Sequence, residues 1–274
     1  MAKTNYLFLG NPGTGKSTLI NCLIGKPVFN AGVTYGGGLT DFFQRYEHNG
    51  VLYMDTPGLA DRKLMKKAAE AITQALRYSG TYKLFFMVRL ENGRVVADDL
   101  STIETVMSCI DMNEVPFSII INNVKKRQFN EIMKKEDAYK EVVTIVNAGQ
   151  YTSPVIEFIP TLSELDEVDN ALAELPDHTT KFIQRWAPTV KIDPENVSEV
   201  RPADFVSVLK DLSAELKRLR EDNNALRQRM DELQKKKGFF CDVGMEVDNT
   251  VSAVNSLIYT IFSPFTSALL GIRN

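Results

Sequence analysis

Cysteine is scarce in this chain of 274 residues, and its three cysteines, Cys22, Cys109 and Cys241, are far apart. Their spacing matches neither a disulfide framework nor a set of metal ligands. This argues against a disulfide-stabilised secreted fold and against a cysteine-bound zinc site. It fits a reducing compartment, in which cysteine acts as a small apolar residue. We therefore expect a cytoplasmic protein, with or without membrane association.

The chain also lacks an excess of charge of either sign. Its 32 Lys and Arg against 35 Asp and Glu give a formal net charge of −3. A near-neutral chain offers no bulk electrostatic argument for binding nucleic acid, so no nucleic-acid partner is predicted. The short apolar run at the N-terminus leads directly into a glycine-rich loop, so we interpret it as the first strand and not as a signal peptide.

Short apolar runs alternate with helical stretches through most of the chain. The expected strands are residues 6–9, 41–47, 51–54, 83–89, 117–122 and 155–159, and the expected helices are residues 17–23, 61–78, 98–109, 130–147 and 166–186. This alternation predicts an α/β fold with a doubly wound, mainly parallel sheet covered by helices on both faces. Asn49-Gly50 signals a tight hairpin, which adds one antiparallel edge strand.

The segment Gly10-Asn-Pro-Gly-Thr-Gly-Lys16-Ser17 matches the P-loop pattern G-x-x-x-x-G-K-[ST] and joins the first strand to the first helix. Glycines let consecutive N–H groups point at phosphate oxygens, and the helix start adds its positive end. Lys16 is expected to bridge the β- and γ-phosphates, and Ser17 to ligate Mg²⁺. The predicted nucleotide-binding residues here are Gly10, Asn11, Pro12, Gly13, Thr14, Gly15, Lys16, Ser17 and Thr18.

A second phosphate-site signal is the apolar strand that ends at Asp55 and continues as Thr-Pro-Gly58. The Asp55 carboxylate is expected to hold a water of the Mg²⁺ shell, as a Walker B aspartate does. Gly58 stands where the D-x-x-G motif of GTPase switch II donates a backbone N–H to the γ-phosphate.

Between these two segments lies a loop with three successive glycines, Gly36 to Gly38, which is costly to order. Such a loop suits a segment that becomes ordered only with nucleotide. Thr40 is our candidate for a catalytic residue and Mg²⁺ ligand here, because it immediately precedes the edge strand, and Thr34 is the alternative. A surface loop with no ligand role is the remaining interpretation.

These motifs resemble those of the TRAFAC-class GTPases, especially the GIMAP family of immunity-associated GTPases and their septin-like relatives. The resemblance covers roughly residues 4 to 190, and its specific parts are the P-loop and Asp55-Thr-Pro-Gly58-Leu59. The stretch from Phe85 to Arg94, with Asp98-Asp99 opening a helix, also looks like the family's segment after that strand. The resemblance implies a G domain that binds GTP or GDP with Mg²⁺ and hydrolyses GTP to GDP and phosphate.

Guanine selection departs from the GTPase pattern [NT]-K-x-D. Asn122 fits the first position, but Asn123 replaces the Lys and Lys125 replaces the Asp. A lysine cannot accept the hydrogen bonds that guanine N1 and N2 donate. Asn122 and Asn123 are therefore candidates for contact with the base or for a plain helix-capping turn. The choice between guanine and adenine stays open.

The attacking water also lacks its usual partner. Leu59 stands where Ras-like GTPases place a water-orienting Gln, and its side chain makes no hydrogen bond. We therefore expect slow intrinsic hydrolysis, with the water oriented by another group, a partner or a second copy. Arg62 and Arg94 are either arginine fingers or solvated surface charges.

Four heptads follow the G domain, with position a at Leu209, Leu216, Asn223 and Met230 and position d at Leu212, Leu219, Leu226 and Leu233. The pattern predicts a parallel two-stranded coiled coil in which Asn223 pairs with its twin. Complementary charges of Glu215 with Arg220 and of Asp222 with Arg227 support it. A long helix folded back on the G domain would bury the same leucines, and this is the alternative.

We divide the chain into a G domain at 1–190, a proline-containing linker at 191–204, a coiled-coil helix at 205–237 and an apolar tail at 238–274. Residues 250–272 carry no charge, and Lys235 to Lys237 precede them. Their Ser, Thr and Pro content favours interfacial or hairpin contact with an anionic membrane over a clean membrane span, and docking on the protein is the alternative. The predicted function is a dimerising GTP-binding switch; a nucleotide-dependent scaffold and an ATPase or promiscuous NTPase are the competing classes.

Overall fold

The computed structural model describes residues 3–32, 42–165 and 168–242, the stretch 234–242 by its backbone only. The chain divides into two units, Met1–Leu216 and Lys217–Asn274. The predictions for Thr34, Gly36 to Gly38, Thr40 and the tail beyond residue 242 lie outside the described residues. Within the described part, no helix has the length and apolar character needed to cross a bilayer.

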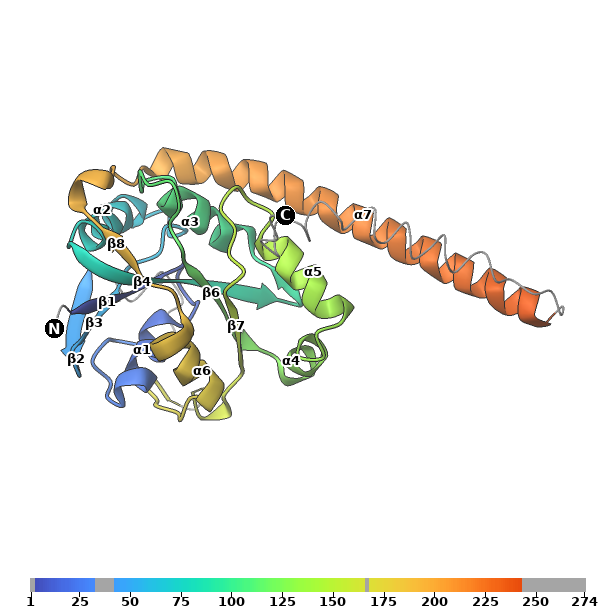
Figure 1. The fold of residues 1–274 in the computed structure, drawn as a ribbon, viewed down its shortest axis with the longest axis horizontal. Helices are drawn as coiled ribbons and strands as arrows, with labels where there is room; N and C mark the ends of the chain where they lie inside the picture. The colour runs from blue at the N-terminus through green and yellow to red at the C-terminus, as the bar shows by residue number, and fades with distance from the viewer. Residues whose placement is uncertain (1–2, 33–41, 166–167, 243–274) are drawn as a thin grey trace, which may run out of the picture. The chain divides into compact units, whose positions relative to one another are not determined.

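A mainly parallel sheet forms the centre of the first unit (Figure 1). Its strands are β1 (Thr4–Leu9), β2 (Gln44–His48), β3 (Val51–Asp55), β4 (Gly80–Glu91), β5 (Arg94–Val95), β6 (Ser118–Val124), β7 (Ile156–Pro160) and β8 (Val190–Ile192). Six of them follow the order β2-β3-β1-β4-β6-β7, and β5 and β8 pair with β4. The α/β fold and the antiparallel β2–β3 hairpin are confirmed, while β5 and β8 add two antiparallel pairs that we did not predict.

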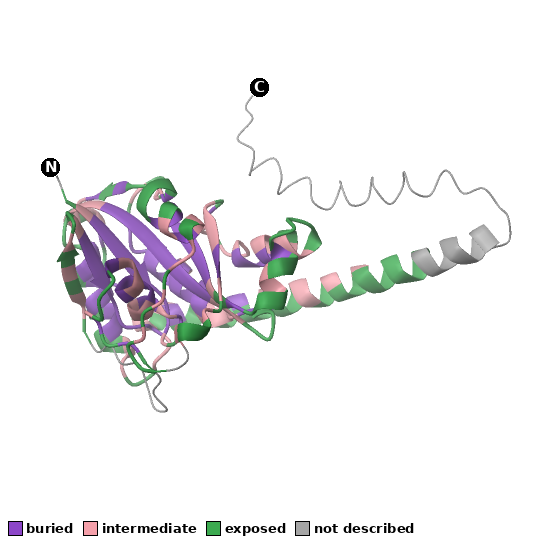
Figure 2. Cartoon of the chain, turned by 90° about the horizontal axis from the view of Figure 1, so that it is seen from below, coloured by how far each residue is buried: buried purple, intermediate pink, exposed green. Residues whose placement is uncertain are grey.

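Helices cover both faces of this sheet (Figure 1). They are α1 (Lys16–Ile24), α2 (Met65–Leu76), α3 (Ala97–Met107), α4 (Lys126–Ile132), α5 (Asp137–Val146) and α6 (Asp177–Lys181). The last helix, α7 (Pro202–Asp242), contributes to this cover only through its first part, up to Leu216. Alternate residues of β1 serve opposite faces. Leu7 and Leu9 join the core under α2 and α3, whereas Tyr6 and Phe8 join the core under α1. The central strands β1, β3, β4 and β6 are accordingly mostly buried on both sides (Figure 2), as a parallel sheet in an α/β fold requires.

Two of the predicted helices are wrong in extent. The helix expected at 130–147 is divided between α4 and α5, because Lys135 adopts a left-handed conformation (φ 58°) that interrupts a helix. Of the helix expected at 166–186, only α6 and the π-helical turn Phe182–Trp186 form among the described residues 168–186. Asn170 is left-handed (φ 59°), and Pro176 disfavours helical geometry in the residue before it.

The expected linker at 191–204 packs on the domain instead. β8 pairs antiparallel with the start of β4, in the register Gly80↔Ile192 and Tyr82↔Val190. The backbone N–H of Val200 then donates to Thr73 Oγ1 of α2 at 3.0 Å. The prolines of this stretch end local elements without detaching the chain, so the compact unit extends to Leu216 and not to residue 190.

The heptad leucines of α7 divide into two groups. Leu212 and Leu216 belong to the core of the first unit, and Leu216 is only 1% exposed. This start of the pattern is used for packing within the domain, as the fold-back alternative expects. Further along, Met230 and Leu233 are exposed, and Asn223 Nδ2 donates to the Leu219 carbonyl of its own helix at 3.0 Å. Leu212 and Leu216 are therefore not available to a coiled-coil seam, and the coiled coil stays a prediction for the heptads after Leu216.

This division predicts opposite results for two matched substitutions in α7. Leu216→Ala should destabilise the domain by about 3 kcal/mol, because it leaves a cavity in the core. Leu233→Ala, at a side chain that is 46% exposed, should change the free energy of unfolding by less than about 0.5 kcal/mol in dilute solution. Urea unfolding of both variants measures this, and equal losses would contradict the division.

Candidate nucleotide-binding site

The loop Gly10–Ser17 joins β1 to α1, as the P-loop pattern predicts. Gly10, Gly13 and Gly15 have φ of 149°, 79° and 86°, which favour glycine. Space requires glycine as well, because a Cβ on Gly10 would lie 2.9 Å from the Met87 carbonyl oxygen of β4. A Cβ on Gly15 would collide with the Asn122 side-chain amide of β6. Atoms of β4 and β6 therefore leave no room for a side chain at these two glycines.

Lys16 lies buried within the loop, where its Nζ donates to the carbonyls of Gly10 at 2.8 Å and Asn11 at 3.2 Å. Burial lowers the pKa of the ammonium group, the carboxylates of Asp55 and Asp99 raise it, and the Arg89 cation lowers it. Neutral carbonyls are weaker partners for a buried cation than charged phosphate oxygens are. The side chain is thus placed to exchange these contacts for phosphate, the role predicted for it.

Ser17 and Asp55 are brought together from α1 and the end of β3. Ser17 Oγ donates to Asp55 Oδ2 at 2.5 Å, and Asp55 is fully buried. Thr56 fixes the turn that follows, because its Oγ1 donates to the Phe8 carbonyl of β1 at 3.1 Å. A hydroxyl and a carboxylate are the hard oxygen ligands that Mg²⁺ prefers, so this pair fits the predicted metal site.

Gly58 packs directly on the P-loop. It does not adopt a left-handed conformation, yet a Cβ here would lie 2.5 Å from Asn11 Cα and 2.7 Å from the Pro12 nitrogen. This position therefore needs glycine for space and not for conformation. The next residue, Leu59, is fully buried in the core that α2 and α3 form with the sheet. Its side chain therefore takes no part in the site.

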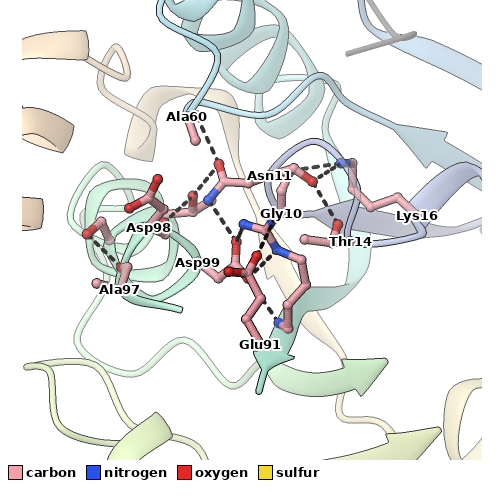
Figure 3. Close-up of polar contacts among 12 residues, drawn as sticks. Gly10, Asn11, Thr14, Lys16, Ala60, Glu91, Ala97, Asp98 and Asp99 are labelled. Atoms are coloured by element: carbon pink, nitrogen blue, oxygen red, sulfur yellow. Dashed lines mark hydrogen bonds and ion pairs between the residues drawn. The ribbon is translucent and has the colours of Figure 1, made fainter. Parts of the chain in front are cut away.

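The Asn11 side chain connects the P-loop to switch II and to α3 (Figure 3). Its Oδ1 accepts from the Ala60 N–H at 3.0 Å and from Thr102 Oγ1 at 3.1 Å, and its Nδ2 donates to Asp99 Oδ1 at 3.0 Å. Asn11 was predicted as a nucleotide-binding residue. Its backbone belongs to the loop, but its side chain is fully buried and acts as a tie between three segments.

Arg89, at the end of β4, is a site residue that the sequence analysis missed. Asp99 binds it through three donors: the backbone N–H of Arg89 at 2.9 Å, Nε at 3.0 Å and Nη2 at 3.0 Å (Figure 3). The arginine at a strand end, followed by Asp98-Asp99 at a helix start, was the available signal. Nothing in the spacing showed that these residues meet beside the P-loop.

Asn122 and Asn123 have different roles in the structure. Asn122 Nδ2 donates to the Thr14 carbonyl at 3.0 Å, so it tethers the P-loop to β6. Asn123 is exposed and left-handed (φ 55°), and neither residue caps α4, whose N-cap is Lys125 without a side-chain cap bond. The helix-capping interpretation is therefore wrong. Arg62 and Arg94, the two candidate arginine fingers, are both exposed.

Two asparagines, Asn21 and Asn170, hold the chain that leads into residues 33–41. Asn21 Oδ1 of α1 accepts from the N–H groups of Val28 at 3.0 Å and Phe29 at 2.9 Å. Ala31 exchanges two 2.8 Å hydrogen bonds with Asn170, one through the Asn170 side chain and one through its backbone. No sequence pattern indicated these contacts, which join the start of the predicted switch segment to the loop after β7.

A phosphate-wrapping loop, a buried lysine and a paired serine and aspartate together define a P-loop nucleotide-binding protein. The match with a family model agrees: residues 5–148, more than half of the 274, match the family described as 50S ribosome-binding GTPase. The chain belongs to this family of P-loop GTPases. None of the curated proteins compared with the chain matches it.

Several solved structures resemble the chain. Era in complex with MgGDPNP and nucleotides 1506–1542 of 16S ribosomal RNA has 20% identity and a TM-score of 0.40, covering 58% of this chain and 52% of its own. Toc33 from Arabidopsis thaliana in complex with GDP and Mg²⁺ has 18% identity and a TM-score of 0.43, and the match covers 70% of this chain and 89% of the Toc33 chain. NFeoB from S. thermophilus bound to GDP·AlF4⁻ and K⁺ has 14% identity and a TM-score of 0.40, and the match covers 85% of this chain and 91% of the NFeoB chain. The chain spans about half the length of the Era chain, and the TM-scores are low, so the family assignment rests on the sequence match and the site.

Proposed function

We propose that this protein is a switch that binds GTP with Mg²⁺ and hydrolyses it slowly to GDP and phosphate. The observation that carries the proposal is the 2.5 Å contact between Ser17 Oγ and Asp55 Oδ2 at the mouth of the P-loop. This pair joins the phosphate loop to switch II at the position where a GTPase senses its nucleotide. The finer resemblance to the GIMAP and septin-like GTPases, carried by Asp55-Thr-Pro-Gly58-Leu59, is part of this proposal.

The residues of this chain have distinct parts in the reaction. Lys16 neutralises charge on the β- and γ-phosphates, and the loop N–H groups hold their oxygens. The Gly58 N–H donates to the γ-phosphate. This bond moves switch II, including Ala60, which lies two residues after Gly58 in the chain. When bound, Mg²⁺ offsets the negative charge that develops on the phosphates, held through Ser17 and the Asp55 carboxylate. Thr40 is proposed as a further ligand and catalytic residue.

Hydrolysis is proposed to be slow because Leu59 lies in the core and cannot orient a water. The same observation favours a second candidate, a scaffold that binds nucleotide with little turnover. A third candidate, an ATPase or promiscuous NTPase, follows from Asn123 and Lys125, which replace the lysine and the aspartate of the usual guanine-reading motif.

The proposed switch works as a dimer, through the G domain or through a coiled coil over residues 217–237. Its proposed location is the cytoplasm, with or without membrane contact through the tail at 238–274. No nucleic-acid partner is proposed, because the net charge is −3 and no basic run dominates the chain.

Two measurements distinguish these candidates. Calorimetric titration with GTP, GDP and ATP, each with Mg²⁺, should show GTP and GDP bound more tightly than ATP. Equal or tighter binding of ATP would replace the GTPase by an NTPase. Specific GTPase activity should then rise with protein concentration, and Leu233→Asp should abolish this rise if the coil brings two copies together. Activity that stays near zero at every concentration would identify a scaffold.

A further inference from the structure

Arg89 stands at the point of the sheet where a nucleotide is expected. Strand β1 pairs in parallel with both β3 and β4, and the chain passes from one side of β1 to the other between them. In open α/β sheets, ligands bind outside the carboxyl ends of the strands at such a switch point. The Met87 carbonyl of β4 lies beside Gly10, and Arg89 follows two residues later. It is therefore at the carboxyl end of β4, level with the P-loop.

The direction of the guanidinium group is fixed from one side. Asp99 accepts from Nε and Nη2, each at 3.0 Å, and is itself held by Asn11 Nδ2. A planar fork bound in this bidentate way has little freedom to rotate. Burial lowers the pKa of Arg89, but the hydrogen bonds and charge of Asp99 outweigh it and raise the pKa overall. Arg89 is thus a fixed, permanent positive charge.

The remaining nitrogen, Nη1, faces the P-loop. It lies 4.0 Å from the position that a Cβ on Gly13 would occupy. Its carboxylate contact is with Glu91 Oε1 at 3.4 Å, and the Glu91 side chain is 64% exposed. An exposed ion pair of this kind contributes little and exchanges readily. The Arg89 side chain is itself 25% exposed, so it is not closed off from solvent on every side.

We propose that Arg89 contacts the nucleotide phosphates through Nη1 and supplies, within one chain, the positive charge that other GTPases take from an arginine finger. This inference rests on the proposed GTP hydrolysis. An arginine at the phosphates stabilises the charge that develops in the transition state. Asn11 and Asp99 act as positioning residues for it.

The test compares Arg89→Gln with Arg127→Gln, a control on α4 whose side chain is 91% exposed. Single-turnover GTP hydrolysis should fall by about 100-fold in Arg89→Gln and stay unchanged in the control. Affinity for GDP with aluminium fluoride should fall far more than affinity for GDP alone, because only the former mimics the developing charge. Added guanidinium ion at millimolar concentration should restore part of the rate.

Equal losses for GDP and for GDP with aluminium fluoride, or a rate that matches the control, would reduce Arg89 to a structural partner of Asp99. If Arg89→Gln does not fold, Glu91→Gln decides, because removing the competing carboxylate should strengthen binding of GDP with aluminium fluoride about threefold. An unchanged affinity in that variant overturns the inference. Failure of the wild-type protein to bind GTP would instead overturn the proposed function, so the two failures are distinguishable.

Discussion

Replacing Lys16 with alanine is expected to weaken GTP binding by about 1000-fold, which corresponds to about 4 kcal/mol. The buried ammonium is the one cation that the P-loop itself carries, and it already lies within 3.2 Å of two loop carbonyls. Its charge-assisted bonds to phosphate oxygens are among the stronger hydrogen bonds in proteins. Calorimetric titration with GTP and Mg²⁺ measures the loss.

The matched control is Lys126→Ala, at an exposed position that begins α4. It should leave the affinity for GTP within about twofold, as a surface change does. Lys16→Ala should remain folded, because removing a buried cation also removes the cost of its burial. An affinity of Lys16→Ala within a few-fold of the wild type would contradict the P-loop assignment.

Replacing Asn11 with alanine is expected to destabilise the domain by about 3 kcal/mol. The fully buried amide makes hydrogen bonds to Ala60, Asp99 and Thr102, and its loss leaves the half-buried Ala60 N–H and the buried Asp99 carboxylate short of partners. Each buried group left unsatisfied costs about 1–3 kcal/mol. The free energy of unfolding in urea is the measurement.

Asn130→Ala is the control for this substitution, because Asn130 is exposed in α4 and alanine favours helix there. Its free energy of unfolding should stay within about 0.5 kcal/mol of the wild type. Comparable losses in the two variants would show that the Asn11 side chain does not tie the loop to switch II and α3.

The parts of the fold that were predicted are those determined by local sequence. The P-loop, the strand ending at Asp55 and the hairpin at Asn49-Gly50 each combine a strand period with a turn signal, and all three form. The segment around β8 was not predictable in this way. Its strand covers three residues between prolines, and it forms only because β4 offers an open edge about a hundred residues earlier in the chain.

The site shows the same division. Ser17 and Asp55 could be predicted to meet, because each belongs to a motif with a known position at the end of a parallel strand. The Asn11–Asp99–Arg89 network could not, since its members lie in three segments and only packing brings them together. Leu59 was recognised as a missing glutamine from its position alone. That it is buried in the core required the structure.

Strand β8 also bears on the solubility of the protein. It occupies the edge of β4 at Gly80–Tyr82, next to the part of β4 that β6 covers from Phe85 onward. A chain shortened to residue 190 would lose this strand and leave unpaired N–H and C=O groups beside an apolar layer. Open edges of that kind are templates for pairing with other chains, which native sheets avoid by covering them. We therefore expect the segment that carries β8 to protect the domain from aggregation.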